Sequence, residues 1–144
     1  MSAISEQQFC PYDLLEELEM SSTLADERKL RSFLCACCRQ ILHKLPEIAQ
    51  NALVVAEEYN QNLVSKERLV AERIKLWQFW DSTPDHYNNP TLEANAVRAV
   101  ICCLYEHMQK HEAFDYATNV MDFCNVVEPK EQEQYQLLQE VFND

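Results

Sequence analysis

One cysteine has arginine residues at the spacing that could activate a thiol. Cys35 follows Arg31 by four residues and precedes Arg39 by four, so all three lie on one face if the segment is helical. Neighbouring guanidinium groups favour the thiolate and lower the pKa of a thiol. The spacing allows a reactive or redox-sensing Cys35, although a nucleophilic enzyme also needs a base, and His43 lies two turns away. The favoured interpretation is that Arg28, Arg31 and Arg39 form ion pairs with carboxylates elsewhere in this acidic chain.

Cysteine and histidine residues in the second half have a spacing that suits metal ligands. On a helix, Cys103 and His107 at i and i+4 could reach one ion, but Cys103 and His111 would lie ~12 Å apart. A closed zinc site needs four ligands, and Cys35 and Cys38 are the pair that another helix could supply. We favour buried thiols and surface imidazoles over a metal site, and we expect no bound cofactor.

Aromatic residues gather before and within the clearest loop of the sequence. Trp77, Phe79 and Trp80 precede the segment 81–90, DSTPDHYNNP, which contains His86 and Tyr87. Trp77 and Trp80 fall on one helical face, so we expect them to pack in the core. The alternative is a surface groove with the loop as its rim, because aromatic residues often dominate recognition.

Acidic residues dominate the sequence and its C-terminal part. The chain has 24 acidic and 12 basic residues, a formal net charge of −12, which disfavours binding to nucleic acid or to an anionic membrane. Residues 111–144 contain eight acids and only Lys130 as a base. This segment is predicted to steer a basic partner protein, with the alternative that its acids only keep the protein soluble. The proposed partner-binding residues are Asp122, Glu128, Glu131 and Glu133.

Motifs for familiar catalytic chemistry are missing from the sequence. The chain contains no glycine, which excludes Gly-rich phosphate loops, and it has no Ser/His/Asp or HExxH arrangement. In a chain this acidic, carboxylate pairs such as Glu16 and Glu17 are expected by chance, so they do not indicate acid–base catalysis. We therefore predict no catalytic residue and a non-enzymatic, acidic, cytoplasmic protein-binding module, for example an immunity or antitoxin-like protein. The alternative is a thiol- or metal-dependent enzyme or sensor that uses Cys35 or Cys103 and His107.

Helical periodicity extends along nearly the whole chain and predicts the elements that position these residues. The fold class is all-α, one domain over 1–144 with six or seven helices in an irregular bundle. In the central helix the apolar line places Cys37 in the core, with Cys38 beside it. An odd number of cysteines, seven, and no visible secretion signal favour free thiols in the cytoplasm. After a first helix that follows Pro11, helices are expected at about 25–44, 46–60, 65–80, 91–110, 112–127 and from 130 onward.

Helix start signals accompany several of these segments. Thr23 and Asp26 resemble a capping pair before the second helix. Ser65 is predicted to cap the helix that follows it, and Asn89 or Thr91 to cap the next.

The segment 28–40, RKLRSFLCACCRQ, resembles the signature of a family of small helical bacterial proteins that is abundant in planctomycetes. The likeness extends to SEQQFCPYDLLEEL near the start, to ALVVAEEYNQNLVSKERL, and to EQYQLLQEVFND at the end. Where the family often has Arg-Ile-Trp after the cysteine pair, this chain has Gln40, Ile41 and Leu42 after Arg39. The resemblance implies a helical, cytoplasmic, bacterial protein and names no activity.

Overall fold

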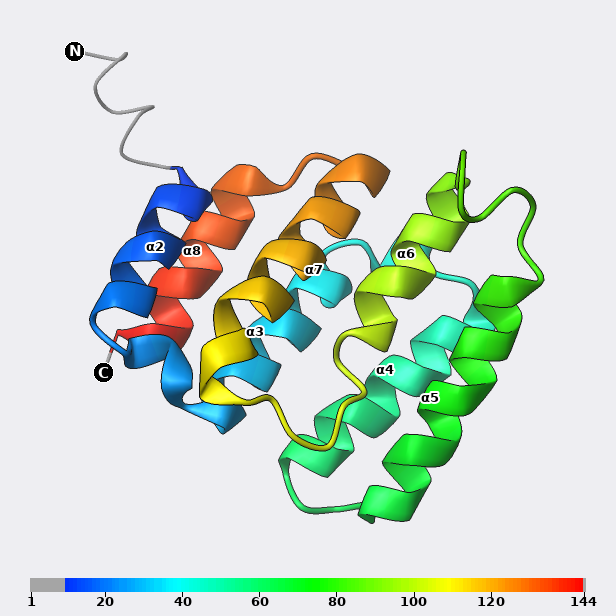
Figure 1. Ribbon diagram of the computed structural model, residues 1–144, viewed down its shortest axis with the longest axis horizontal. Helices are drawn as coiled ribbons and strands as arrows, with labels where there is room; N and C mark the ends of the chain where they lie inside the picture. The colour runs from blue at the N-terminus through cyan, green and yellow to red at the C-terminus, as the bar shows by residue number, and fades with distance from the viewer. Residues whose placement is uncertain (1–9, 144) are drawn as a thin grey trace.

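Seven α-helices make up the described part of the chain, residues 10–143, in this computed structural model (Figure 1). The structure is 74% helical and the described residues contain no strand, which confirms the predicted all-α fold. The helices are α2 (Pro11–Met20), α3 (Glu27–Arg39), α4 (Glu47–Asn60), α5 (Lys66–Asp81), α6 (Leu92–Ile101), α7 (Ala113–Val127) and α8 (Glu131–Phe142). Short 3₁₀ turns lie at Thr23–Ala25, Leu42–Lys44 and Lys110–Glu112.

Helix α3 is central to the packing. It contacts α4, α6, α7 and α8, and in Figure 1 it lies behind α7. The burial predicted for the apolar line is confirmed, because each of its residues is fully buried: Leu30, Phe33, Leu34, Cys37 and Ile41. The helix itself ends at Arg39, before the predicted end near residue 44, so Ile41 lies in the turn that follows it. All seven helices contribute side chains to one hydrophobic core. The helices that pack on α3 are therefore also held to one another through that core.

Side-chain caps fix where three of the helices begin. Ser65 accepts a hydrogen bond from the Arg68 amide at 3.1 Å, which confirms it as an N-cap. The Thr91 hydroxyl accepts from the Ala94 amide at 3.0 Å and caps α6. The predicted pairing of Thr23 with Asp26 is wrong, because Thr23 begins a 3₁₀ turn.

Asp26 is itself the N-cap of α3. Its backbone is extended, and its carboxylate accepts from the Lys29 amide at 3.1 Å. We expect Asp26→Ala to lower the free energy of unfolding by about 1 kcal/mol, since an orphan amide at the helix start loses its acceptor. Urea denaturation measures the change, and Thr23→Ala serves as the matched control with a smaller loss. A larger loss for Thr23→Ala than for Asp26→Ala would contradict this assignment.

Turns that often use glycine use other residues in this chain. Ser22, Asn62 and Asp85 have positive φ values of 64°, 64° and 49°. Asn and Asp tolerate this left-handed region better than most residues, because their short side chains can hydrogen-bond locally. Chain reversal is therefore achieved without any glycine.

The helix predicted to extend to about residue 110 ends much earlier, at Ile101. Residues 102–109 are not helical, although Leu104 and Met108 are buried. Side chains from other helices satisfy the backbone here: Arg73 donates to the Leu104 carbonyl at 3.1 Å, and the Glu27 carboxylate accepts from the Met108 amide. These tertiary hydrogen bonds replace the intrahelical ones that residues 102–109 would otherwise form. Leu104 and Met108 therefore remain buried at positions of the apolar pattern, although the segment is not helical.

Across residues 10–143, none of the helices combines the length and the apolar character that a membrane crossing would require.

Candidate functional site

Five of the cysteines gather around the middle of the core. Cys35, Cys37 and Cys38 lie on α3, Cys103 follows α6, and Cys124 lies on α7. The Cys38 and Cys103 sulfurs are 3.8 Å apart, and the Cys124 thiol donates to the Cys37 carbonyl at 3.7 Å. The predicted burial of Cys37 and Cys38 is confirmed, since both are fully buried. All seven cysteines of the chain are free thiols.

The environment of Cys35 disfavours the thiolate, contrary to the effect that the arginine spacing suggests. The neighbouring Cys103 thiol and burial raise the pKa of Cys35 well above its usual value, and the opposing effect of Arg31 is smaller. Arg39 forms two hydrogen bonds with the Glu57 carboxylate, at 2.8 and 2.6 Å. Cys35 lines a groove of about 620 Å³ between α3, α4 and Leu137 of α8, but only 3% of its surface is exposed. These surroundings therefore favour the neutral form of the Cys35 thiol.

The spacing of Cys103 and His107 does not create a shared helical face. Both residues lie in the non-helical segment after α6, where Cys103 is fully buried and His107 is exposed. His111 lies beyond this segment, in an exposed 3₁₀ turn. Within residues 10–143, no group of three or more His, Cys, Asp or Glu side chains has an arrangement that could hold a metal ion.

The aromatic residues before the 81–90 loop form a packed cluster with it. Trp80 is 4% exposed, and its ring meets Trp77 at 5.4 Å, His86 at 4.4 Å and Tyr87 at 5.4 Å between centroids. The Arg98 guanidinium lies over the rings of Trp77 and Trp80, at 5.1 Å from each. Core packing is confirmed for Trp80, and Trp77 is partly buried against the core. Tyr87 is 80% exposed at the outer side of the cluster.

The acidic residues predicted for partner binding follow α7 and begin α8. Glu128 accepts from His43 at 2.8 Å and lies 2.9 Å from the Lys130 ammonium. These two partners, Lys130 first, lower the pKa of Glu128 and keep its carboxylate ionised. Glu133 lies 4.0 Å from Lys130. Glu131 and Glu133 are both exposed.

Asp122 links α7 to α2. It accepts a hydrogen bond from the Tyr12 hydroxyl at 2.7 Å, and Asn125 donates to the same hydroxyl at 3.2 Å. Burial and the bond to Asp122 raise the pKa of Tyr12. The contact brings an acidic helix from the start of the chain against the acidic helices at its end.

Sequence reasoning missed this third acidic helix. Helix α2 packs against both α7 and α8, and the three stand side by side in Figure 1. Together the three helices contain no lysine or arginine. They contain nine acidic residues, all exposed: Asp13, Glu16, Glu17, Glu19, Asp115, Asp122, Glu131, Glu133 and Glu140. We call these residues the acidic three-helix surface; the run of acids in 11–20 was a visible signal, but its partner helices were not.

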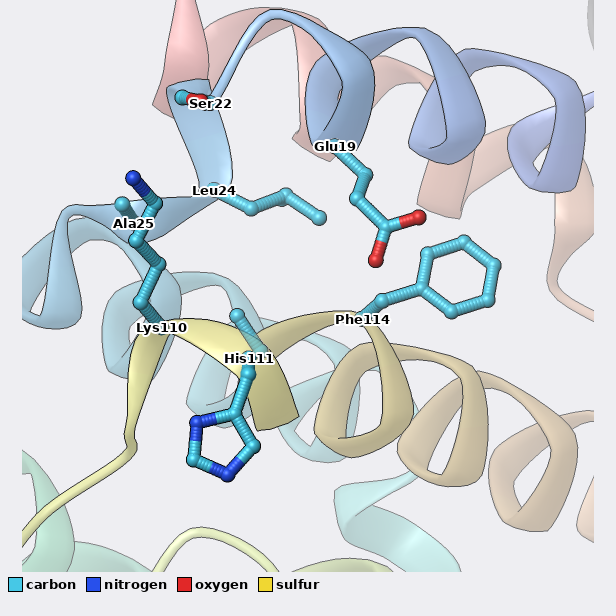
Figure 2. A pocket seen from close by; sticks show the side chains of 8 residues that line it. Glu19, Ser22, Leu24, Ala25, Lys110, His111 and Phe114 are labelled. Carbon is cyan, nitrogen blue, oxygen red and sulfur yellow. The ribbon is translucent and has the colours of Figure 1, made fainter.

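A pocket of about 340 Å³ lies between the end of α2 and the start of α7 (Figure 2). Glu19 and Leu24 approach it from one side and Phe114 from the other, while the His111 ring points away. Its lining is mixed, and no metal-ligating set faces it. The pocket borders the acidic three-helix surface through Glu19.

No family model, curated protein or solved structure matches this chain. The candidate site therefore rests on the residues themselves. Its buried thiols and dispersed histidines do not assemble a nucleophile with a base, which covalent catalysis requires. Its three helices without lysine or arginine, in contrast, contain nine exposed acids, and concentrated negative charge attracts cations and basic proteins.

Proposed function

We propose that the protein is a non-enzymatic, cytoplasmic protein-binding module that docks on a basic partner protein through the acidic three-helix surface. The observation that supports this proposal is the charge of α2, α7 and α8, which have nine exposed acids and no lysine or arginine. Like charges placed this densely destabilise the folded chain by self-repulsion, and a partner of opposite charge relieves it.

The distribution of basic residues supports a directional surface. Most of the lysines and arginines lie on α3 and α5 or in the turn that follows α3, and none lies on α2, α7 or α8. Lys130, which precedes α8, is already paired with Glu128. A basic partner that approaches α2, α7 and α8 therefore meets mainly negative side chains, which steer its approach.

An immunity or antitoxin-like role is the concrete form of this function. A protein of that class inhibits a toxin by covering its active surface, and a nuclease toxin has a basic surface because it binds nucleic-acid phosphates. A helical acidic protein matches that surface in charge. Nucleic acid itself and anionic membranes are disfavoured as partners, because the chain carries a net charge of −12.

Amide substitutions test the proposal without changing side-chain shape. One variant combines Asp122→Asn, Glu128→Gln, Glu131→Gln and Glu133→Gln, and a second combines Asp13→Asn, Glu16→Gln, Glu17→Gln and Glu19→Gln. With a partner identified by cross-linking, each is expected to lower the association rate constant about tenfold or more and to reduce its salt dependence, because steered association depends on charge. Surface plasmon resonance over a range of NaCl concentrations measures both quantities.

A matched control changes the same number of charges elsewhere. Glu47, Glu58, Glu67 and Glu93 lie on α4, α5 and α6, outside the three acidic helices, and their quadruple Gln variant has the same net charge as the test variants. It is expected to retain most of the association rate. If all three variants associate as fast as the unchanged protein, with the same salt dependence, the acidic three-helix surface is not the docking site. Urea denaturation of each variant checks that the fold is retained.

A further inference from the structure

Arg31 is a buried cation with an unusual set of partners. Its side chain is only 3% exposed, although arginine is almost never this buried without a partner of opposite charge. One terminal nitrogen donates to the Tyr105 carbonyl, and the guanidinium lies 5.0 Å from the centre of the Tyr59 ring. Its Nε is buried and has no hydrogen-bond partner. These contacts hold the group in place without neutralising its charge.

No carboxylate among residues 10–143 lies within ion-pair distance of Arg31. Glu27 is one helical turn before it on α3, but its carboxylate accepts from the Met108 amide instead. Glu106 is nearby in the fold and is held by Arg73, at 2.6 Å. Burying a guanidinium without a counter-ion costs free energy, and removal of the positive charge by deprotonation is not available to arginine. An anion bound from solution would provide the negative counter-charge that Arg31 lacks.

A pocket gives such an anion a place beside Arg31. The cavity has a volume of about 280 Å³, and its lining contains two arginines and two glutamates together with polar and aromatic residues: Glu27, Arg28, Arg31, Tyr59, Asn60, Asn62, Glu106 and His107. The Arg28 and Arg31 guanidinium groups are the cations of the lining, and the Tyr59 ring provides an apolar wall. None of the lining residues belongs to α2, α7 or α8, so the pocket is separate from the acidic three-helix surface.

We propose that this pocket binds a small molecule through a single oxyanion group, a carboxylate or a phosphate, with Arg31 as its counter-ion. Planar guanidinium groups match both oxyanions in geometry. Glu27 and Glu106 also line the cavity, and they limit the ligand to one anionic group by repelling a second. The ligand site thus adds a small-molecule function to a protein whose proposed partner surface lies elsewhere.

Backbone-amide NMR of the full chain tests the proposal with sodium acetate and sodium phosphate as separate probes, at constant ionic strength with NaCl. Saturable shifts at residues 59–62 and 105–107 are expected for at least one probe. Stronger binding of acetate indicates a carboxylate ligand, and stronger binding of phosphate indicates a phosphorylated one. If neither probe gives saturable shifts at these residues, the proposal is wrong.

Two variants and a control assign the binding to Arg31. Arg31→Met keeps the length of the side chain and its packing on Tyr59 but removes the charge, and it is expected to weaken binding about tenfold or more, as loss of a charged partner does. Arg68→Met on α5 removes an exposed arginine outside the pocket, and it is expected to bind like the unchanged protein. Equal affinity of the Arg31 and Arg68 variants would overturn the proposal.

Asn62→Asp decides the question if the Arg31 variant does not fold. Asn62 is exposed at the pocket and has a positive φ that Asp also tolerates, so the backbone is preserved. The added negative charge is expected to weaken anion binding about threefold or more through repulsion across a few ångströms. Unchanged affinity of this variant would contradict a site in this pocket.

Discussion

Titration of the native protein with DTNB is expected to modify one thiol quickly and six slowly. Cys10 is partly exposed, whereas the other six cysteines are buried. A buried thiol reacts only when the surrounding structure opens, so we expect suppression of about 10³-fold or more relative to the unfolded chain, for an opening free energy near the global 5–15 kcal/mol. Five of these thiols have a raised pKa, which adds to the protection because the thiolate is the reacting species: Cys35, Cys37, Cys38, Cys102 and Cys103.

The dependence on pH has a definite sign. Burial raises the pKa of Cys102 to about 11, with a smaller opposing effect from Arg98, and the pKa of Cys35 is raised as well. The thiolate fraction of these groups is therefore small at neutral pH and grows as the pH rises. Cys10→Ser is the matched variant, since it removes the fast phase and leaves the six slow thiols. All seven thiols should react quickly in concentrated guanidinium chloride.

The same experiment separates the two classes of function that the sequence left open. A fast phase that persists in Cys10→Ser protein would show an accessible or activated thiol in the native state. That result would favour a thiol-dependent enzyme or redox sensor, with Cys35 as the first residue to replace. If all six thiols react slowly, they serve only as buried core residues. That result would favour the protein-binding module over a thiol-dependent enzyme or sensor.

Features that depend on one helix alone, such as its buried face and its N-cap, could be predicted from the local sequence. The apolar line of α3 predicted buried residues because side chains at i, i+3 and i+4 share one face of any helix. Ser65 and Thr91 were identified because an N-cap satisfies amides of its own helix. The all-α fold follows from the same periodicity repeated along the chain.

The features that could not be predicted from the sequence depend on contacts between segments far apart in the chain. The end of α6 depends on Glu27 and Arg73, which satisfy the backbone of residues 104–108 from two other helices. The pKa of Cys35 depends on Cys103, which lies 68 residues further along the chain. The acidic three-helix surface likewise exists only because α2 packs on α7 and α8. Each is a tertiary outcome that no local spacing encodes.

Truncation of Phe33 is expected to cause the largest loss of stability among single substitutions considered for this protein. Phe33 is fully buried at the centre of α3, and its ring lies 6.3 Å from the ring of Phe142 on α8, at an angle of 57°. Phe33→Ala removes a large buried ring and leaves a cavity, so the free energy of unfolding should fall by about 3–5 kcal/mol. Guanidinium denaturation followed by circular dichroism measures the change.

Leu63→Ala is the control, because the Leu63 side chain is 66% exposed. This variant should lower the free energy of unfolding by no more than about 0.5 kcal/mol. A double-mutant cycle between Phe33→Ala and Phe142→Ala isolates the contact of the two rings, with an expected coupling of about 0.5–1.5 kcal/mol. A loss below about 1 kcal/mol for Phe33→Ala would contradict the central place of this residue, since even smaller core truncations usually exceed that value.

The Phe33–Phe142 contact also connects stability to the proposed function. Phe142 anchors the end of α8 on α3, and α8 carries Glu131, Glu133 and Glu140 of the acidic three-helix surface. When this ring contact is lost, α8 should detach from α3 more readily than α4 does, because Phe142 lies on α8. Amide hydrogen exchange of Phe142→Ala protein is therefore expected to accelerate in α8 before α4. Equal acceleration in both helices would mean that the acidic surface is not held by this contact.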